Sequence, residues 1–293
     1  METILTRFNC TTLQGKLKLL IKCIIFVIGS TLISTSIHAF DSAFIQHVHG
    51  KPSFVSSSLM YFSLLERALF VIGYLVLGYQ LPIKNHVLRG FTYFMLICMS
   101  NYLPQVMGLA GADGEIAHQA FSASIIIDDC IGYILSGFLL GFLFNEVPDS
   151  PKRFCLKPTY SLTIAISGIC FPLIVIALDQ IVNMIYPPFA SAGAIGVSSE
   201  AQSLFFVIFY SCFIVSGIFL AIFYRMTEYN QSSPYAWLLF GLKYDLLIWT
   251  PVVMIMVIFG TPLIPTVFYS FLFLICILLI SWLNSRLLDA KMA

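Results

Sequence analysis

Long apolar runs alternate with short polar connectors along the whole chain. Several of these runs reach about 18 or more residues, the length that is typical of a transmembrane helix. The pattern predicts an all-α, polytopic integral membrane protein with eight spans. The predicted spans cover residues 21–40, 54–82, 88–110, 119–145, 160–186, 202–225, 235–259 and 264–285.

The composition favours the same environment. Of the 293 residues, 59% are hydrophobic and only 10% are charged, whereas soluble domains carry about 25% charged residues. So few charges cannot cover a surface that faces water, so the lipid bilayer is the expected surrounding. The net charge of +1 offers no basic surface for a nucleic acid.

The basic residues between the spans predict the orientation. Of the 15 basic residues, Arg67 and Lys243 lie deep within spans and Lys51 lies on one face, while the other 12 lie at or beyond the span ends on the face that holds both termini. The positive-inside rule therefore predicts cytoplasmic termini in a cell (inner or plasma) membrane. The first run also has the pattern of a secretory signal, and cleavage after the small residue Ala39 would leave seven spans.

The two halves of the chain show a weak internal similarity. The segment "RGFTYFMLI" at 89–97 resembles "FGLKYDLLI" at 240–248, and each is followed by a proline and then Val-Met. Four spans return the chain to its starting side, so two four-span units form parallel repeats, an architecture that transporters use. We expect a first four-helix membrane unit at 1–150 and a second at 151–293, separated by the polar linker 146–158.

Seven charged residues interrupt the apolar runs at graded depths. A charge at the bilayer centre costs about 2.5–3.5 kcal/mol on insertion scales, so such residues face the protein interior and usually serve function. Neighbours in a helix do not face each other, so we expect the two adjacent charges of the second span to meet partners on other helices. The seven residues are Glu66, Arg67, Asp128, Asp129, Asp179, Lys243 and Asp245.

Carboxylates at graded depth suit proton coupling or the passage of a cation. We expect a transporter or permease for a small solute or ion, in which the carboxylates take up protons or a cation. Arg67 then pairs with a neighbouring acid or with an anionic group of the substrate. The alternative is a non-catalytic membrane component for assembly, immunity or sensing, whose buried charges only fix helix packing.

Sequence motifs of enzyme chemistry do not occur in the chain. There is no HExxH, GxSxG or Walker A motif, which disfavours a zincin, an α/β-hydrolase or a P-loop ATPase. The eight cysteines form no CxxC, and "HVH" at 47–49, with His38 and Asp41 nearby, is a weak metal motif that a solvated loop explains. We therefore expect no catalytic residue, metal or cofactor, and the sequence does not fix the oligomeric state.

Overall fold

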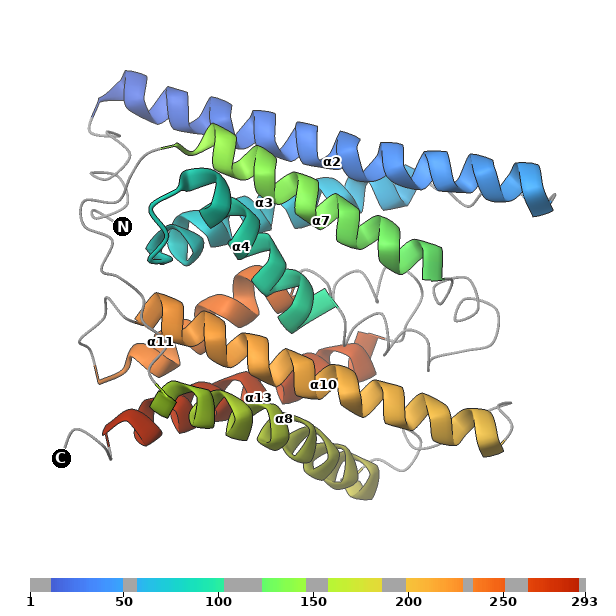
Figure 1. The fold of residues 1–293 in the computed structure, drawn as a ribbon, viewed down its shortest axis with the longest axis vertical. Coiled ribbons are helices and arrows are strands. Elements are labelled where there is room, and N and C mark those ends of the chain that lie inside the picture. Colours follow the sequence, from blue (N-terminus) through green and yellow to red (C-terminus); the bar gives the residue numbers. More distant parts are fainter. Residues whose placement is uncertain are drawn as a thin grey trace. The chain divides into compact units, whose positions relative to one another are not determined.

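The computed structural model describes residues 12–49, 57–102, 123–145, 158–185, 199–228, 234–250 and 263–289. Within these ranges the chain forms eight α-helices and no strand (Figure 1), so the predicted all-α class is confirmed. Each apolar run identified in the sequence overlaps with one of these helices.

The chain divides into two compact units. The first unit comprises Met1–Met95 with Ala123–Arg153, and the second comprises Leu96–Ser122 with Phe154–Ala293. The segment 96–122 groups with the later part of the chain, whereas the sequence prediction divided the units after residue 150. The internal repeat stays a prediction.

In the first unit, α2 packs along α7 and α3. The 3-10 turn η1 follows α3 and leads towards α4. The elements of this unit are α2 (Leu13–His49), α3 (Ser57–Val76), η1 (Gly78–Gln80), α4 (His86–Ile97) and α7 (Ala123–Leu143).

The helices α4 and α7 meet backbone to backbone at glycines. A Cβ atom added to Gly90 of α4 would lie 2.5 Å from the carbonyl oxygen of Gly137 and 2.6 Å from the amide nitrogen of Gly141 on α7. Small residues spaced four apart permit this close approach. The crossing therefore leaves no room for a side chain at Gly90.

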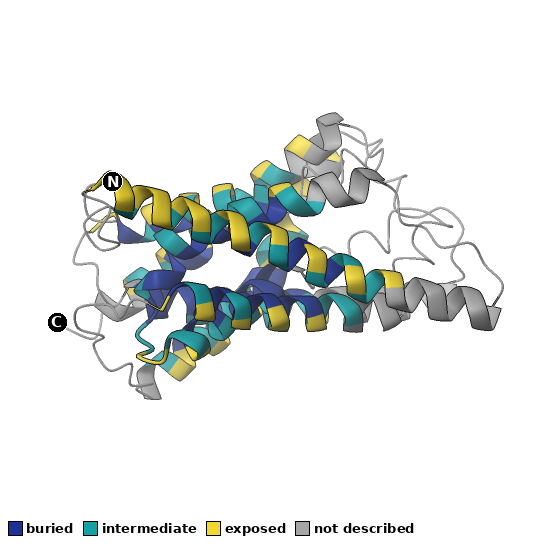
Figure 2. Cartoon of the chain, turned by 90° about the horizontal axis from the view of Figure 1, so that it is seen from above, coloured by how far each residue is buried: buried dark blue, intermediate teal, exposed yellow. Residues whose placement is uncertain are grey.

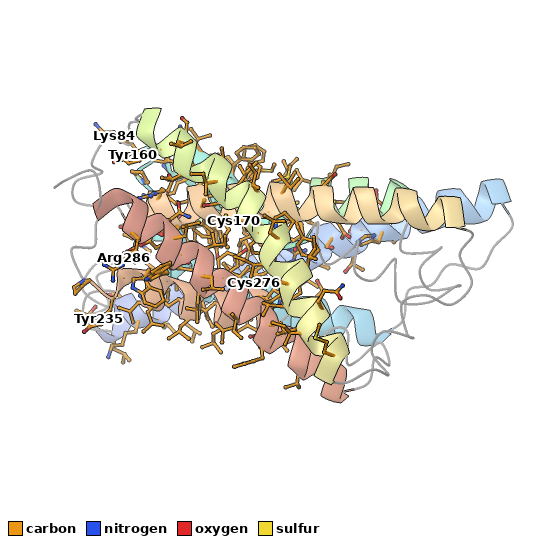
Figure 3. The ribbon with its side chains drawn as sticks, turned by 90° about the horizontal axis from the view of Figure 1, so that it is seen from below. Lys84, Tyr160, Cys170, Tyr235, Cys276 and Arg286 are labelled. Atoms are coloured by element: carbon orange, nitrogen blue, oxygen red, sulfur yellow. The ribbon has the colours of Figure 1, made fainter. Side chains whose placement is uncertain are left out.

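In the second unit, α8 packs along α10 and α13, and α11 packs against α13. Figure 3 places Tyr160 of α8 and Arg286 of α13 at the same end of this unit, so these two helices run antiparallel. The helix α8 continues through Pro172. The α-helices of this unit are α8 (Pro158–Ile185), α10 (Ser199–Glu228), α11 (Ala236–Tyr244) and α13 (Leu263–Asp289).

Both α4 and α11 pass directly into a π-helical turn. The turn η2 (Cys98–Tyr102) follows α4, and η3 (Asp245–Trp249) follows α11. In the sequence a proline stands two residues beyond each turn, at Pro104 and Pro251. Because proline has no N–H for the carbonyl four residues earlier, a change of hydrogen-bonding pattern just before it is physically expected.

The exposed face of α2 is apolar and its buried face is partly polar. Leu17, Ile24 and Ile28 are about half exposed, whereas Ser30 and Ser34 are buried. Figure 2 shows the exposed positions as a yellow stripe along this helix. This distribution is the reverse of that in a helix on the surface of a water-soluble protein.

Two described stretches are long and apolar enough to cross a membrane, Leu13–Ala39 in α2 and Tyr160–Leu178 in α8. The described apolar stretches of α10 and α13, Ser211–Thr227 and Ser270–Arg286, are shorter. The structure thus gives a helical protein with features of membrane association, and the eight-span arrangement stays a prediction.

Candidate functional site

Four of the predicted charged residues gather inside the first unit. Glu66 and Arg67 come from α3, and Asp128 and Asp129 come from α7. Asp129 lies close enough to Glu66 for the two carboxyl groups to interact electrostatically. The charged residues of two predicted spans therefore belong to one polar cluster.

His38 of α2 joins this cluster through both of its ring nitrogens. Its Nε2 donates a hydrogen bond to Oδ1 of Asp129 over 3.0 Å, and its Nδ1 lies 3.8 Å from Oδ2 of Asp128. The sequence analysis placed His38 near the end of the first span and the "HVH" motif in a loop after it, whereas in the structure α2 includes both His38 and residues 47–49. A histidine between two carboxylates can hold and pass a proton.

Glu66 and Arg67 form an ion pair with each other. The Nε atom of Arg67 lies 3.8 Å from Oε2 of Glu66, and both residues are buried. The sequence interpretation that the two adjacent charges do not face each other is therefore wrong, whereas each does have a partner on another helix, because Tyr133 of α7 contacts both residues. Long side chains that emerge in different directions can still bend together, which the backbone angle alone does not exclude.

Tyr133 of α7 links the two charges of α3 to the rest of the cluster. Its hydroxyl donates a weak hydrogen bond to Oε1 of Glu66 over 3.4 Å. The centre of the Arg67 guanidinium lies 4.9 Å from the centroid of the Tyr133 ring, within the range of a cation–π interaction. Tyr133 follows Asp129 by four residues, so one face of α7 presents both groups.

The guanidinium of Arg67 is buried without hydrogen bonds to the described residues. Arg67 is only 3% exposed, and its Nε and Nη1 atoms find no hydrogen-bond acceptor in the described part of the chain. A buried donor without an acceptor costs about 1–3 kcal/mol, and more when it is charged. Such a residue is therefore a candidate for function rather than a simple packing element.

The remaining predicted residues lie in the second unit. Lys243 is half-buried near the end of α11, and Asp245 begins η3, where its Oδ2 accepts a hydrogen bond from the Thr250 hydroxyl over 3.4 Å. Asp179 belongs to α8, but its side chain lies outside the described residues. Lys243 and Asp245 are therefore described with the second unit, and the cluster above with the first.

A second buried arginine, Arg225 of α10, organises the polar interior of the second unit. It donates hydrogen bonds to the carbonyl oxygen of Asn284 and, over 3.5 Å, to the Thr163 hydroxyl. The Asn284 amide donates in turn to Ser167 over 2.7 Å. Sequence reasoning placed Arg225 on the cytoplasmic face, because it is the last residue of the sixth predicted span.

The π-turns take part in a second set of hydrogen bonds in this unit. The Asn101 amide of η2 donates to the carbonyl oxygen of Ile248 in η3 over 2.9 Å. The hydroxyl groups of Ser100 and Tyr244 lie 2.6 Å apart. Side chains thus fasten η2 to the end of α11 and to η3.

The described residues include no group of three or more His, Cys, Asp or Glu side chains arranged to hold a metal ion. The chain matches no protein-family model, and comparisons with curated proteins and with solved structures give no significant match. The function must therefore be argued from the clusters themselves.

Proposed function

We propose that this protein is a multi-pass membrane transporter that couples the movement of a small solute or ion to protons. The observation that carries the proposal is the cluster of His38, Glu66, Arg67, Asp128 and Asp129 inside a unit whose exposed faces are apolar. Ionisable residues inside a membrane-embedded bundle usually mark an ion or proton pathway.

The proposed topology has eight spans with both termini in the cytoplasm. Two observations support it: the exposed apolar stripe on α2, and similar exposed residues on α8 such as Ile169 and Leu173. The basic residues of the connectors supply the orientation. In this arrangement the interior of each four-helix unit is shielded from lipid by the outer faces of its own helices.

The cluster contains two groups that can bind and release a proton. His38 binds a proton between two aspartates, and Glu66 binds one when it is not engaged by Arg67. Each protonation changes the charge of a buried site, and a neighbouring solute or ion has to compensate for that change. This linkage between protonation and binding is the physical basis of coupled transport.

The test uses purified protein in liposomes that contain a pH-sensitive dye. We expect an imposed ion or pH gradient to drive proton movement through the wild-type protein. Glu66→Gln and Asp128→Asn should abolish this movement while membrane abundance stays unchanged. Glu228→Gln, at the last residue of α10, is the control and should transport normally.

The alternative of a static membrane component makes the opposite prediction. The two side chains of the α3 ion pair can be exchanged in the double variant Glu66→Arg/Arg67→Glu, which keeps the pair but moves each charge. If this variant retains the full cellular function and no gradient moves protons through the wild-type protein, the transport proposal is wrong. Equal loss of abundance and of flux in Glu66→Gln would contradict the coupling role of Glu66.

A further inference from the structure

We propose that the side chain of Arg67 occupies the binding site of the transported substrate. The substrate is an organic cation with dispersed charge, such as a quaternary ammonium or guanidinium compound. The inference rests on the proposed transport function and names the substrate class of the same cluster. In this view Arg67 is a tethered cation that fills the site while no substrate is bound.

The first argument is the way in which the guanidinium is held. A buried arginine normally forms directional, often bidentate, hydrogen bonds with a carboxylate. The Nε of Arg67 instead lies 3.8 Å from Oε2 of Glu66, and neither Nε nor Nη1 has a hydrogen-bond acceptor among the described residues. The site therefore stabilises a positive charge without requiring the bound cation to donate hydrogen bonds. Recognition of a quaternary ammonium group has the same requirement, because that group has no N–H.

The second argument is the aromatic lining of the site. The guanidinium centre lies 4.9 Å from the ring centroid of Tyr133 and 5.7 Å from that of Phe70. Phe94 of α4 packs on both rings, with centroid distances of 5.9 Å to each. Cations held by aromatic faces are a general mode of recognising quaternary ammonium ligands.

The third argument is the sign of the charge in the cluster. Three carboxyl groups, one guanidinium and one imidazole make up the described cluster of α2, α3 and α7, so the carboxyl groups outnumber the fixed cation. The polar groups of α4 bond elsewhere in the unit. The Tyr93 hydroxyl donates a hydrogen bond to the carbonyl oxygen of Phe70, and Nε of Arg89 donates one to the Tyr74 hydroxyl. The field at the cluster therefore favours a cation over an anion.

The exchange of a proton for the substrate cation conserves the charge of the site. A cation that enters between the rings displaces the Arg67 guanidinium and takes over the Glu66 carboxylate. When Glu66 is protonated beforehand, the entering cation releases that proton, so one positive charge replaces another. The reverse step restores the proton, and the site moves one cation against one proton.

The experiment measures binding of tetramethylammonium chloride to the purified full-length protein by calorimetry, with a pH indicator in weak buffer. We expect proton release by wild type to approach one proton per cation bound at pH values where Glu66 is protonated before binding, and to fall to none where the Glu66–Arg67 ion pair is already formed. Arg67→Ala should bind the probe about tenfold more tightly, because the tethered competitor no longer occupies the site. Glu66→Gln should release no proton.

Two further variants keep the test decisive. Arg67→Lys retains a charge on a compact, strongly hydrated group that leaves the rings more readily, so its affinity should lie between those of wild type and Arg67→Ala. Lys84→Ala removes an exposed cation of the same unit, labelled in Figure 3, and should bind like wild type. A melting curve of each variant establishes that it is folded.

Several outcomes would overturn this inference. Unchanged or weaker probe binding in both folded Arg67 variants contradicts the tethered cation, and binding of benzoate that depends on Arg67 shows an anion site instead. If no variant binds the cation while proton flux in liposomes still depends on Glu66, the substrate class is wrong and the transport function stands. If that flux is also missing, both proposals fail.

Discussion

Two buried arginines, Arg67 in the first unit and Arg225 in the second, are held by different physical means. In the second unit, Arg225 also lies beside tyrosine rings, but it donates to an uncharged carbonyl and a hydroxyl, within a chain of directional hydrogen bonds that continues through Asn284 to Ser167. In the first unit, Arg67 is held by one ion pair and by aromatic faces. Directional bonds fix one geometry, whereas charge and ring contacts tolerate displacement.

Under the proposed transport function, this difference predicts which unit moves. A network of neutral partners stays the same when protons bind or leave, so the interior around Arg225 is suited to a scaffold. The cluster around Arg67 changes its charge whenever His38 or Glu66 exchanges a proton. Motion and ligand exchange are therefore expected in the first unit, and structural support in the second.

The largest expected effect is on stability. Arg225→Met removes two hydrogen bonds from a charged donor, each worth about 1.5–3 kcal/mol, so it should lower the free energy of unfolding by about 3 kcal/mol or more. The double variant Glu66→Gln/Arg67→Met removes both members of a buried pair and should stay within about 1 kcal/mol of wild type. Unfolding monitored by circular dichroism in lipid nanodiscs measures the free energy of unfolding of both variants. Equal losses of stability would contradict the proposed difference between Arg225 and Arg67.

A smaller loss of stability is expected from glycine substitutions, and it should differ between two helix crossings. Gly90→Ala would place Cβ against the backbone of α7, which cannot move away, and should cost about 1–3 kcal/mol. Gly241→Ala is the matched control, because its Cβ would meet only Cδ2 of Leu278, at 2.6 Å, which is the end of a flexible side chain. We expect the melting temperature to fall clearly in the first variant and little in the second. Similar losses would show that the α4–α7 crossing is not unusually close-packed.

The smallest expected loss of stability comes from removing single tyrosine hydroxyl groups, one in each unit. Tyr244→Phe loses the 2.6 Å contact with Ser100 and should cost about 1 kcal/mol. Tyr133→Phe keeps the ring beside Arg67 and loses only the 3.4 Å contact with Glu66. Its loss of stability should be below about 0.5 kcal/mol, at the lower limit for a single hydrogen bond. Chemical denaturation of both variants decides the order, and a larger loss for Tyr133→Phe would contradict it.

The sequence predicts the helices well because long apolar runs are a strong and local signal. Glu66, Arg67, Asp128 and Asp129 could also be selected as a group, since charges inside such runs are rare. The ion pair between Glu66 and Arg67 could not be predicted, because it depends on how two side chains bend. Backbone direction alone pointed to separate partners.

Other members of the sites carry no distinctive signal. Tyr133 is one of 14 tyrosines in an aromatic-rich chain, and only the position of α3 beside it gives the hydroxyl a role. The "HVH" segment at 47–49 was assigned to a loop because the helix boundary was placed near residue 40, whereas α2 continues to His49, and no sequence signal pointed from His38 to the aspartates of α7. Arg225 ends an apolar run, a position from which a long side chain can point to solvent or turn inwards.

The π-turns η2 and η3 also affect how the chain tolerates changes in its length. A π-turn accommodates one residue more than the α-helical turn it replaces. Deleting one residue within an ordinary helix such as α2 rotates every later side chain by about 100°. Deletion within η2 or η3 can instead convert the turn to α-helix and leave both flanking faces in register. Single-residue insertions and deletions during evolution should therefore accumulate at these two turns and be excluded from the neighbouring helices.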